Sequence, residues 1–239
     1  MQTVLKLISV LPGLDWAALV VFFGGWFGYA RFAKRRATTQ PSVLASTNRV
    51  RHQWMLQTTR REVRVLDAVV MQSLSTSPSF FASTTILIIG GLLAVLGTTE
   101  KASELVRDLP FTAQTSTLVF DLKLLLLLAI FVYCFFRFTW SMRQYTFGAM
   151  IVAAAPELGQ FDAAGASAEM QRNAFADRAG RVVSLAAETF NDGLRGYYFA
   201  FAAIGWFFSS LAFMVATAGV IVILYRREFQ SEVLAVLNS

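Results

Sequence analysis

The sequence predicts an all-α polytopic membrane protein with four transmembrane helices and additional amphipathic helices on the cytoplasmic side. Of the 239 residues, 56% are hydrophobic and only 15% are charged, against roughly 45–50% and about 25% in soluble domains. The apolar residues also gather into four long segments, each near the roughly 20 residues that cross a hydrocarbon core as a helix. These observations exclude an ordinary soluble domain, a disordered chain and a disulfide scaffold.

The four predicted spans cover residues 14–32, 80–99, 118–140 and 197–225. A spanning helix satisfies its backbone polar groups internally, so we expect these segments to form one helical bundle. On this basis residues 1–239 form a single integral membrane domain.

The charge of the loops predicts the orientation in the membrane. Eight basic residues and only two acidic ones follow the first predicted span: Lys34, Arg35, Arg36, Arg49, Arg51, Arg60, Arg61 and Arg64 against Glu62 and Asp67. Basic loops stay on the cytoplasmic side. The net charge of +6 therefore reflects orientation rather than nucleic-acid binding, and we expect both termini in the periplasm. Arg226 and Arg227, after the fourth predicted span, run against this orientation.

Two cytoplasmic loops are too long to be simple connections. Residues 44–78 and 141–195 carry apolar side chains at helical spacing, which predicts amphipathic helices that cap or extend the spans.

The junction before the second predicted span is a candidate anion or headgroup site. Ser77 followed by Pro78 is typical of a helix start, with a capping hydroxyl and a proline in the first turn. Free N–H groups, hydroxyls and guanidiniums would then converge on an anion. The candidate residues are Arg60, Arg61, Arg64, Ser77, Ser79, Ser83 and Thr84. The alternative is a capped helix beside an arginine-rich surface that touches anionic lipid headgroups.

Two charged residues fall inside the third predicted span. Asp121 and Lys123 lie about 200° apart around a helix, so each needs its own partner or a route to water. Two environments stay open for Lys123: the bundle interior or a subunit interface, and snorkelling to the membrane surface.

Small residues at helical spacing predict close helix packing. They are Gly24, Gly28, Gly90, Ala94 and Gly205. Packing within one bundle is the favoured interpretation, and because four spans make a thin bundle we also expect a homo-oligomer.

Several blocks of sequence resemble a bacterial inner-membrane family, the domain of unknown function five-nine-nine. The blocks are residues 54–67, 79–85, 138–145, 154–156 and 197–229, so the resemblance spans nearly the whole chain. It implies a helical membrane protein of Gram-negative bacteria and supplies no reaction, substrate or catalytic residue.

Two functions stay open on the sequence. One is an oligomeric channel or transporter-like protein with an anion-attracting cytoplasmic mouth. The other is a non-catalytic accessory or scaffold protein whose basic cytoplasmic helices bind lipid headgroups or a partner complex. An enzyme is not expected, because His52 and Cys134 are the sole residues of their kinds and no catalytic motif is present. No cofactor, metal ion or nucleic acid is expected as a ligand, whereas membrane lipids are expected as partners.

Overall fold

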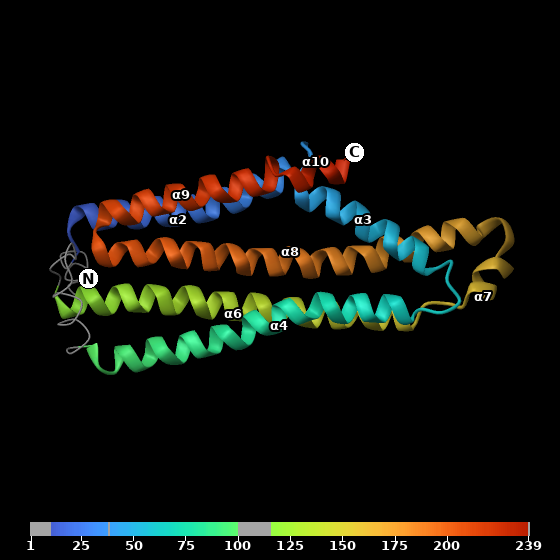
Figure 1. Cartoon of the computed structure of the whole chain (residues 1–239), viewed down its shortest axis with the longest axis horizontal. Coiled ribbons are helices and arrows are strands. Elements are labelled where there is room, and N and C mark those ends of the chain that lie inside the picture. Colours follow the sequence, from blue (N-terminus) through green and yellow to red (C-terminus); the bar gives the residue numbers. More distant parts are fainter. Residues whose placement is uncertain (1–10, 38, 100–115, 239) are drawn as a thin grey trace, which may run out of the picture. The chain divides into compact units, whose positions relative to one another are not determined.

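Every element of secondary structure in the described residues is helical. The computed structural model describes residues 11–37, 39–99 and 116–238. The helices are α2 Gly13–Arg36, α3 Val43–Thr58, α4 Val65–Leu96, α6 Thr117–Ala153, α7 Leu158–Ala163, the 3-10 helix η1 Gly165–Ser167, α8 Ala168–Phe208, α9 Ser210–Phe229 and α10 Glu232–Asn238 (Figure 1). The predicted all-α class is confirmed.

The chain divides into two compact units. Unit 1 comprises Met1–Arg36, Thr85–Cys134 and Leu194–Arg227, and unit 2 comprises Ala37–Thr84, Phe135–Gly193 and Glu228–Ser239. Helices α4, α6 and α8 each contribute residues to both units.

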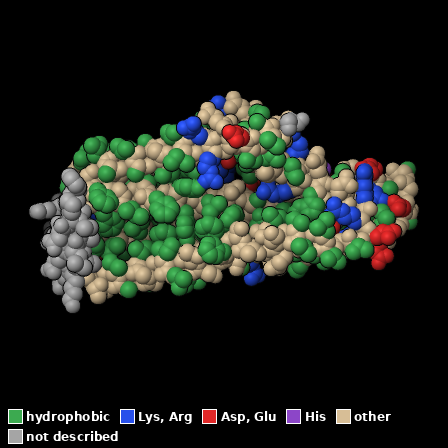
Figure 2. Space-filling model, in the orientation of Figure 1, with side chains coloured by type: hydrophobic (Ala, Val, Ile, Leu, Met, Phe, Trp, Pro, Cys, Tyr) green, Lys and Arg blue, Asp and Glu red, His purple; other side chains and the backbone are tan. Residues whose placement is uncertain are grey.

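Four helices of the described chain are long and apolar enough to cross a membrane. They are Gly13–Arg36, Val65–Leu96, Thr117–Ala153 and the combined α9–α10 stretch Ser210–Asn238. Hydrophobic side chains form a broad band over unit 1 in Figure 2, whereas charged side chains gather around the α7 end of unit 2. The predicted polytopic membrane protein with four such helices is confirmed.

The fourth predicted span, residues 197–225, differs from the structure because it is not one helix. Helix α8 ends at Phe208, and the Ser209 hydroxyl accepts a hydrogen bond from the Ala212 N–H at 2.9 Å, which caps α9. The chain then reverses, and Trp206 stacks on Phe213 with ring centroids 5.5 Å apart. Gly205 permits this hairpin, because a Cβ there would lie 3.1 Å from the Ala212 carbonyl oxygen. A hydropathy profile misses the break, since the residues on both sides of it are apolar.

The hairpin changes the expected course of the chain through unit 1. Helices α2 and α9 are parallel, because the Ser210 hydroxyl donates to Asp15 near their starts and Phe32 contacts Tyr225 near their ends. The start of α2 and the end of α9 therefore lie at opposite ends of unit 1. The prediction of two periplasmic termini assumed a single crossing over residues 197–225, whereas the structure divides this segment between α8 and α9.

Aromatic side chains fill the centre of unit 1. Phe22 is fully buried and packs edge-on against Phe199, while Trp26 stacks on Phe199 with ring centroids 5.3 Å apart. Since apolar contact alone gives little preference between lipid and a neighbouring helix, this close packing is what selects these helix neighbours.

Both predicted cytoplasmic loops are helical in unit 2, with breaks that the sequence pattern did not show. The first loop is broken between Thr58 and Val65, and the second between Ala153 and Ala168. The core of unit 2 holds Met55, Met71, Tyr145, Phe175 and Val183. Helix α10 adds to α3 through the Ser46 hydroxyl, which donates to Asn238 Oδ1 at 3.0 Å.

Candidate functional site

A buried carboxylate holds the connection between α3 and α4 in unit 2. Asp67 is fully buried in the first turn of α4, where the helix dipole favours a negative charge. Its Oδ1 accepts three hydrogen bonds, from Trp54 Nε1 at 2.7 Å, Thr58 Oγ1 at 3.1 Å and an Arg61 nitrogen at 2.5 Å. Its Oδ2 has no hydrogen-bond partner among the described residues. One oxygen thus fixes the geometry of the connection, and the other retains its accepting capacity.

The arginines predicted to attract an anion are each engaged within unit 2. Arg60 pairs with Glu169 at 3.1 Å, and Arg61 pairs with Asp67. Arg64 donates to the Ala155 carbonyl oxygen at 2.8 Å and also to that of Pro156. These contacts tie the α3–α4 connection to the segment that follows α6.

The predicted helix start at Ser77 and Pro78 is wrong, so the candidate anion or headgroup site has no helix N-terminus at this position. Helix α4 runs without interruption from Val65 to Leu96, so Pro78 lies inside it. Its neighbouring N–H groups are therefore not those of a helix terminus. Ser77 lies roughly 18 Å along the helix from Val65, at a rise of about 1.5 Å per residue.

The other members of the predicted site follow the same helix away from the arginines. Ser79 is half-buried, Ser83 is exposed, and the Thr84 hydroxyl donates to the Phe80 carbonyl oxygen at 2.9 Å. The structure does not bring these hydroxyls together with Arg60, Arg61 and Arg64.

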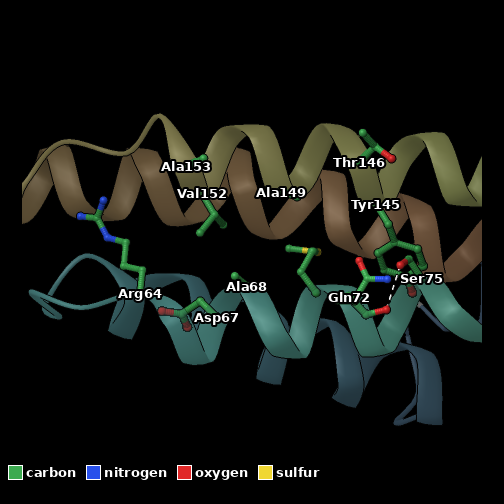
Figure 3. A pocket seen from close by; sticks show the side chains of 11 residues that line it. Arg64, Asp67, Ala68, Gln72, Ser75, Tyr145, Thr146, Ala149, Val152 and Ala153 are labelled. Atoms are coloured by element: carbon green, nitrogen blue, oxygen red, sulfur yellow. Dashed lines mark hydrogen bonds between the residues drawn. The ribbon is translucent and has the colours of Figure 1, made fainter.

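A half-open cavity of about 460 Å³ lies between α4 and α6. Its polar lining residues are Arg64, Asp67, Gln72, Ser75, Tyr145 and Thr146, and between them lie apolar residues that include Met71, Ala149 and Val152. Figure 3 shows Tyr145 of α6 reaching toward Gln72 and Ser75 of α4. The volume falls within the 300–1,000 Å³ range of ligand pockets.

An apolar groove of about 350 Å³ lies between α3 and α4, and its lining includes Arg51 of α3 and Arg61 of the α3–α4 connection. It is lined by Val50, Arg51, Trp54, Arg61, Leu66 and Val70. Two of its apolar lining residues are well exposed, Leu66 at 60% and Val50 at 48%. Burial lowers the pKa of Arg51, while Tyr145 and the negative charge of Glu188 act in the opposite direction.

A further arginine, Arg172, holds α8 against neighbouring segments of unit 2. Arg172 is buried, donates to the Thr59 carbonyl oxygen at 2.6 Å and pairs with Asp162 at 2.5 Å. Its guanidinium also lies 5.0 Å from the centroid of the Phe161 ring. No local sequence pattern singles out Arg172, because the Thr59 carbonyl that it binds is 113 residues away.

Lys123 lies in the interior of unit 1, which is one of the two environments left open by the sequence. It is only 2% exposed, and its ammonium lies 5.6 Å and 5.8 Å from the ring centroids of Trp206 and Phe207. Asp15 of α2 acts on it electrostatically. The Asp15 carboxylate is buried and accepts hydrogen bonds from Trp206 Nε1 at 2.8 Å and from the Ser210 hydroxyl.

Asp121 takes a different position from Lys123. It is partly exposed, yet its Oδ1 is buried and has no hydrogen-bond partner among the described residues. Sequence reasoning missed Asp15, whose only signal was a lone acidic residue at the start of an apolar segment.

Most of the predicted small-residue packing positions face open space within this chain. A Cβ at Gly24, Gly28 or Gly90 would meet nothing within 4 Å, and Ala94 is exposed. The close contact on α2 falls instead at Gly25, where a Cβ would lie 2.9 Å from Ile221 Cδ1. Gly205 lies at the close approach of the α8–α9 hairpin described above.

The two single-copy residues, His52 and Cys134, have separate surroundings. His52 Nε2 lies 2.9 Å from Asp177 Oδ1 on the surface of unit 2, and Cys134 is a buried free thiol of unit 1. The described part of the chain contains no group of three or more metal-ligating side chains.

Together these features define an all-helical membrane protein, with an aromatic-packed unit and a second unit that carries a cavity and an apolar groove. The family described as protein of unknown function, DUF599, matches residues 17–233, and the chain therefore belongs to this family. None of the curated proteins and none of the solved structures is similar enough to match the chain.

Proposed function

We propose that this chain is a non-catalytic membrane protein that docks an acidic amphipathic helix of a partner protein in the α3–α4 groove. The groove itself is the observation that carries this proposal. Its apolar floor includes Val50, Leu66 and Val70, and guanidiniums stand beside it at Arg51 and Arg61. A helix with an apolar face and acidic flanks matches this chemistry.

Lipid acyl chains are a poor alternative occupant of the groove. With residues 80–99 as the spanning part of α4, Leu66 lies roughly 20 Å before the hydrocarbon edge, at a rise of about 1.5 Å per residue. An exposed leucine at that distance favours a protein surface as its cover.

The charge around the groove favours an acidic partner. Residues 49–70 contain five arginines, at positions 49, 51, 60, 61 and 64, and two acidic residues, at 62 and 67. Ion pairs with Glu169 and Asp67 compensate part of this charge. The remaining moderate positive charge can attract an acidic partner.

The proposed location is the inner membrane of a bacterium, with the groove on the cytoplasmic side. The parallel course of α2 and α9 supports a revised orientation, in which Lys34, Arg35 and Arg36 share the cytoplasmic side with Arg226 and Arg227. The start of α2 is then periplasmic and the end of α9 cytoplasmic. This removes the conflict that Arg226 and Arg227 posed for two periplasmic termini.

Purification in mild detergent tests the docking function. We expect the parent chain to co-purify with a partner in fixed stoichiometry, and Leu66→Glu to lose it because the carboxylate repels an acidic helix. Met170→Glu is the matched control, since Met170 is 69% exposed in unit 2 and lies outside the groove. A homogeneous homo-oligomer without any partner would contradict docking, and the same experiment checks the homo-oligomer predicted from the sequence.

A transport function is the second candidate, supported by the buried charges Lys123 and Asp15 of unit 1, because ionisable groups inside a membrane often mark an ion path. The anion-attracting mouth has lost its support, since its arginines are engaged and its hydroxyls lie elsewhere. Flux through liposomes tests this candidate. Flux equal to that of empty liposomes, with Lys123→Ala indistinguishable from the parent, rejects it.

A further inference from the structure

We infer that the cavity between α4 and α6 binds a small neutral amphiphile whose head group carries two or more hydroxyls. The inference does not depend on partner docking in the α3–α4 groove. It follows from two features of the cavity: polar side chains that can form further hydrogen bonds, and an apolar wall between them.

The polar walls of the cavity present both hydrogen-bond acceptors and hydrogen-bond donors. The Ser75 hydroxyl donates its proton to the Gln72 carbonyl oxygen at 2.8 Å, and the Thr146 hydroxyl donates to the Met142 carbonyl oxygen at 3.1 Å. Each hydroxyl oxygen keeps its lone pairs for another donor. The Gln72 amide and the Tyr145 hydroxyl line the same cavity and can donate. A ligand that matches these walls must therefore both donate and accept hydrogen bonds, as a hydroxyl group does.

The charge of the surroundings selects a neutral donor over a cation. Asp67 is the acidic residue of the cavity lining, and its charge is compensated by Arg61 at 2.5 Å. Arg64 adds a further positive charge at the same end. An ammonium would meet this positive surplus, whereas an anion would meet the acceptor oxygens of Ser75 and Thr146. Hydroxyl groups satisfy the acceptors without either conflict.

The middle of the cavity supplies the apolar contact. Ala149 and Val152 separate the Asp67 end from the end at Ser75 and Tyr145 (Figure 3), and Met71 also lines the cavity. Along α4, residues 64 to 75 span roughly 16 Å at a rise of about 1.5 Å per residue. A short acyl chain fits along this wall beside a glycerol-like head group.

Binding of monooctanoylglycerol to the full chain in nanodiscs tests the inference, with octanoate and octylamine as charged probes of the same chain length. We expect saturable binding of monooctanoylglycerol that is tighter than that of either charged probe. The double variant Ser75→Ala with Thr146→Val should weaken it roughly tenfold, because two neutral hydrogen bonds are lost. Ala149→Phe should abolish it by filling the apolar wall.

Matched controls keep the result interpretable. Ser73→Ala removes an exposed α4 hydroxyl two residues away that does not line the cavity, and it should bind like the parent. A thermal melt checks that each variant is folded. If Ala149→Phe does not fold, the double variant of Ser75 and Thr146 alone tests the inference. Equal or tighter binding of a charged probe, absence of binding, or equal weakening by Ser73→Ala would overturn the inference.

Discussion

The indole N–H of Trp54 donates a 2.7 Å hydrogen bond to the buried carboxylate of Asp67. Trp54 lines the α3–α4 groove, and Asp67 lines the cavity between α4 and α6. One hydrogen bond therefore joins the walls of the two candidate sites in unit 2, and both sites depend on the same carboxylate for their shape.

Replacing Asp67 with alanine should destabilise unit 2 strongly. The change strands three donors, on Trp54, Thr58 and Arg61, and leaving such groups without a charged acceptor costs about 2–3 kcal/mol. Asp67→Asn keeps one acceptor oxygen and should cost less. Melting temperatures of the purified variants give their order of stability. Asp177→Ala is the control, because Asp177 is exposed. An Asp67→Ala melt equal to that of Asp177→Ala would argue against an anchoring role.

A methyl group at Gly193 should disturb the α6–α8 contact in unit 2. A Cβ there would lie 2.5 Å from Cε1 of the fully buried Phe138, and such overpacking costs about 1–3 kcal/mol. Gly219→Ala is the control, since a Cβ at Gly219 meets nothing within 4 Å. We expect a lower melting temperature for Gly193→Ala alone. Equal melts would mean that Phe138 moves aside at no cost.

Asp15 and Lys123 should be energetically coupled in unit 1. Asp15→Ala leaves the Trp206 N–H, the Ser210 hydroxyl and the buried ammonium of Lys123 without their carboxylate, so we expect it to destabilise by about 2–3 kcal/mol. Adding Lys123→Met should restore part of the loss, because the unpaired charge is then gone. A double-mutant cycle in melting experiments measures this coupling. Strictly additive effects would contradict it.

The α8–α9 hairpin predicts a cytoplasmic end for α9 and a periplasmic turn between the two helices. A fluorescent protein fused to the carboxyl terminus should fold and fluoresce, as it does in the cytoplasm. A cysteine in place of the exposed Phe208 should react with an impermeant thiol reagent added outside intact cells, against a low background because Cys134 is buried. A cysteine in place of the exposed Gln53 should react only after permeabilisation. The reverse pattern would restore the orientation predicted from the sequence.

The sequence predicted what depends on composition and local spacing. Apolar length located the spanning helices, and helical periodicity located the helices of unit 2. The break at Ser209 was invisible because hydropathy does not change across it, although residues 197–225 exceed the length that one crossing needs. Pro78 misled the prediction because a proline in a first turn and a proline inside a long helix follow similar sequence patterns.

The candidate sites depended on contacts that no local pattern contains. Trp54 and Asp67 are 13 residues apart, and they lie on two helices whose pairing only the fold supplies. The arginine cluster was visible, yet its role was not, because the Glu169 carboxylate and the Ala155 carbonyl are remote in sequence. The dense arginines thus lie where contacts hold unit 2 together.

The docking of an acidic helix in the α3–α4 groove is tested most directly by photo-crosslinking from position 66. A photoreactive amino acid replaces Leu66 in the full chain, in its native membrane, and the crosslinked peptide is sequenced by mass spectrometry. Met170, which is exposed outside the groove, is the control position. We predict one peptide from another protein, net acidic and with apolar residues at helical spacing, from position 66 and not from position 170. Crosslinks only to lipid or to a second copy of this chain would contradict the proposed function.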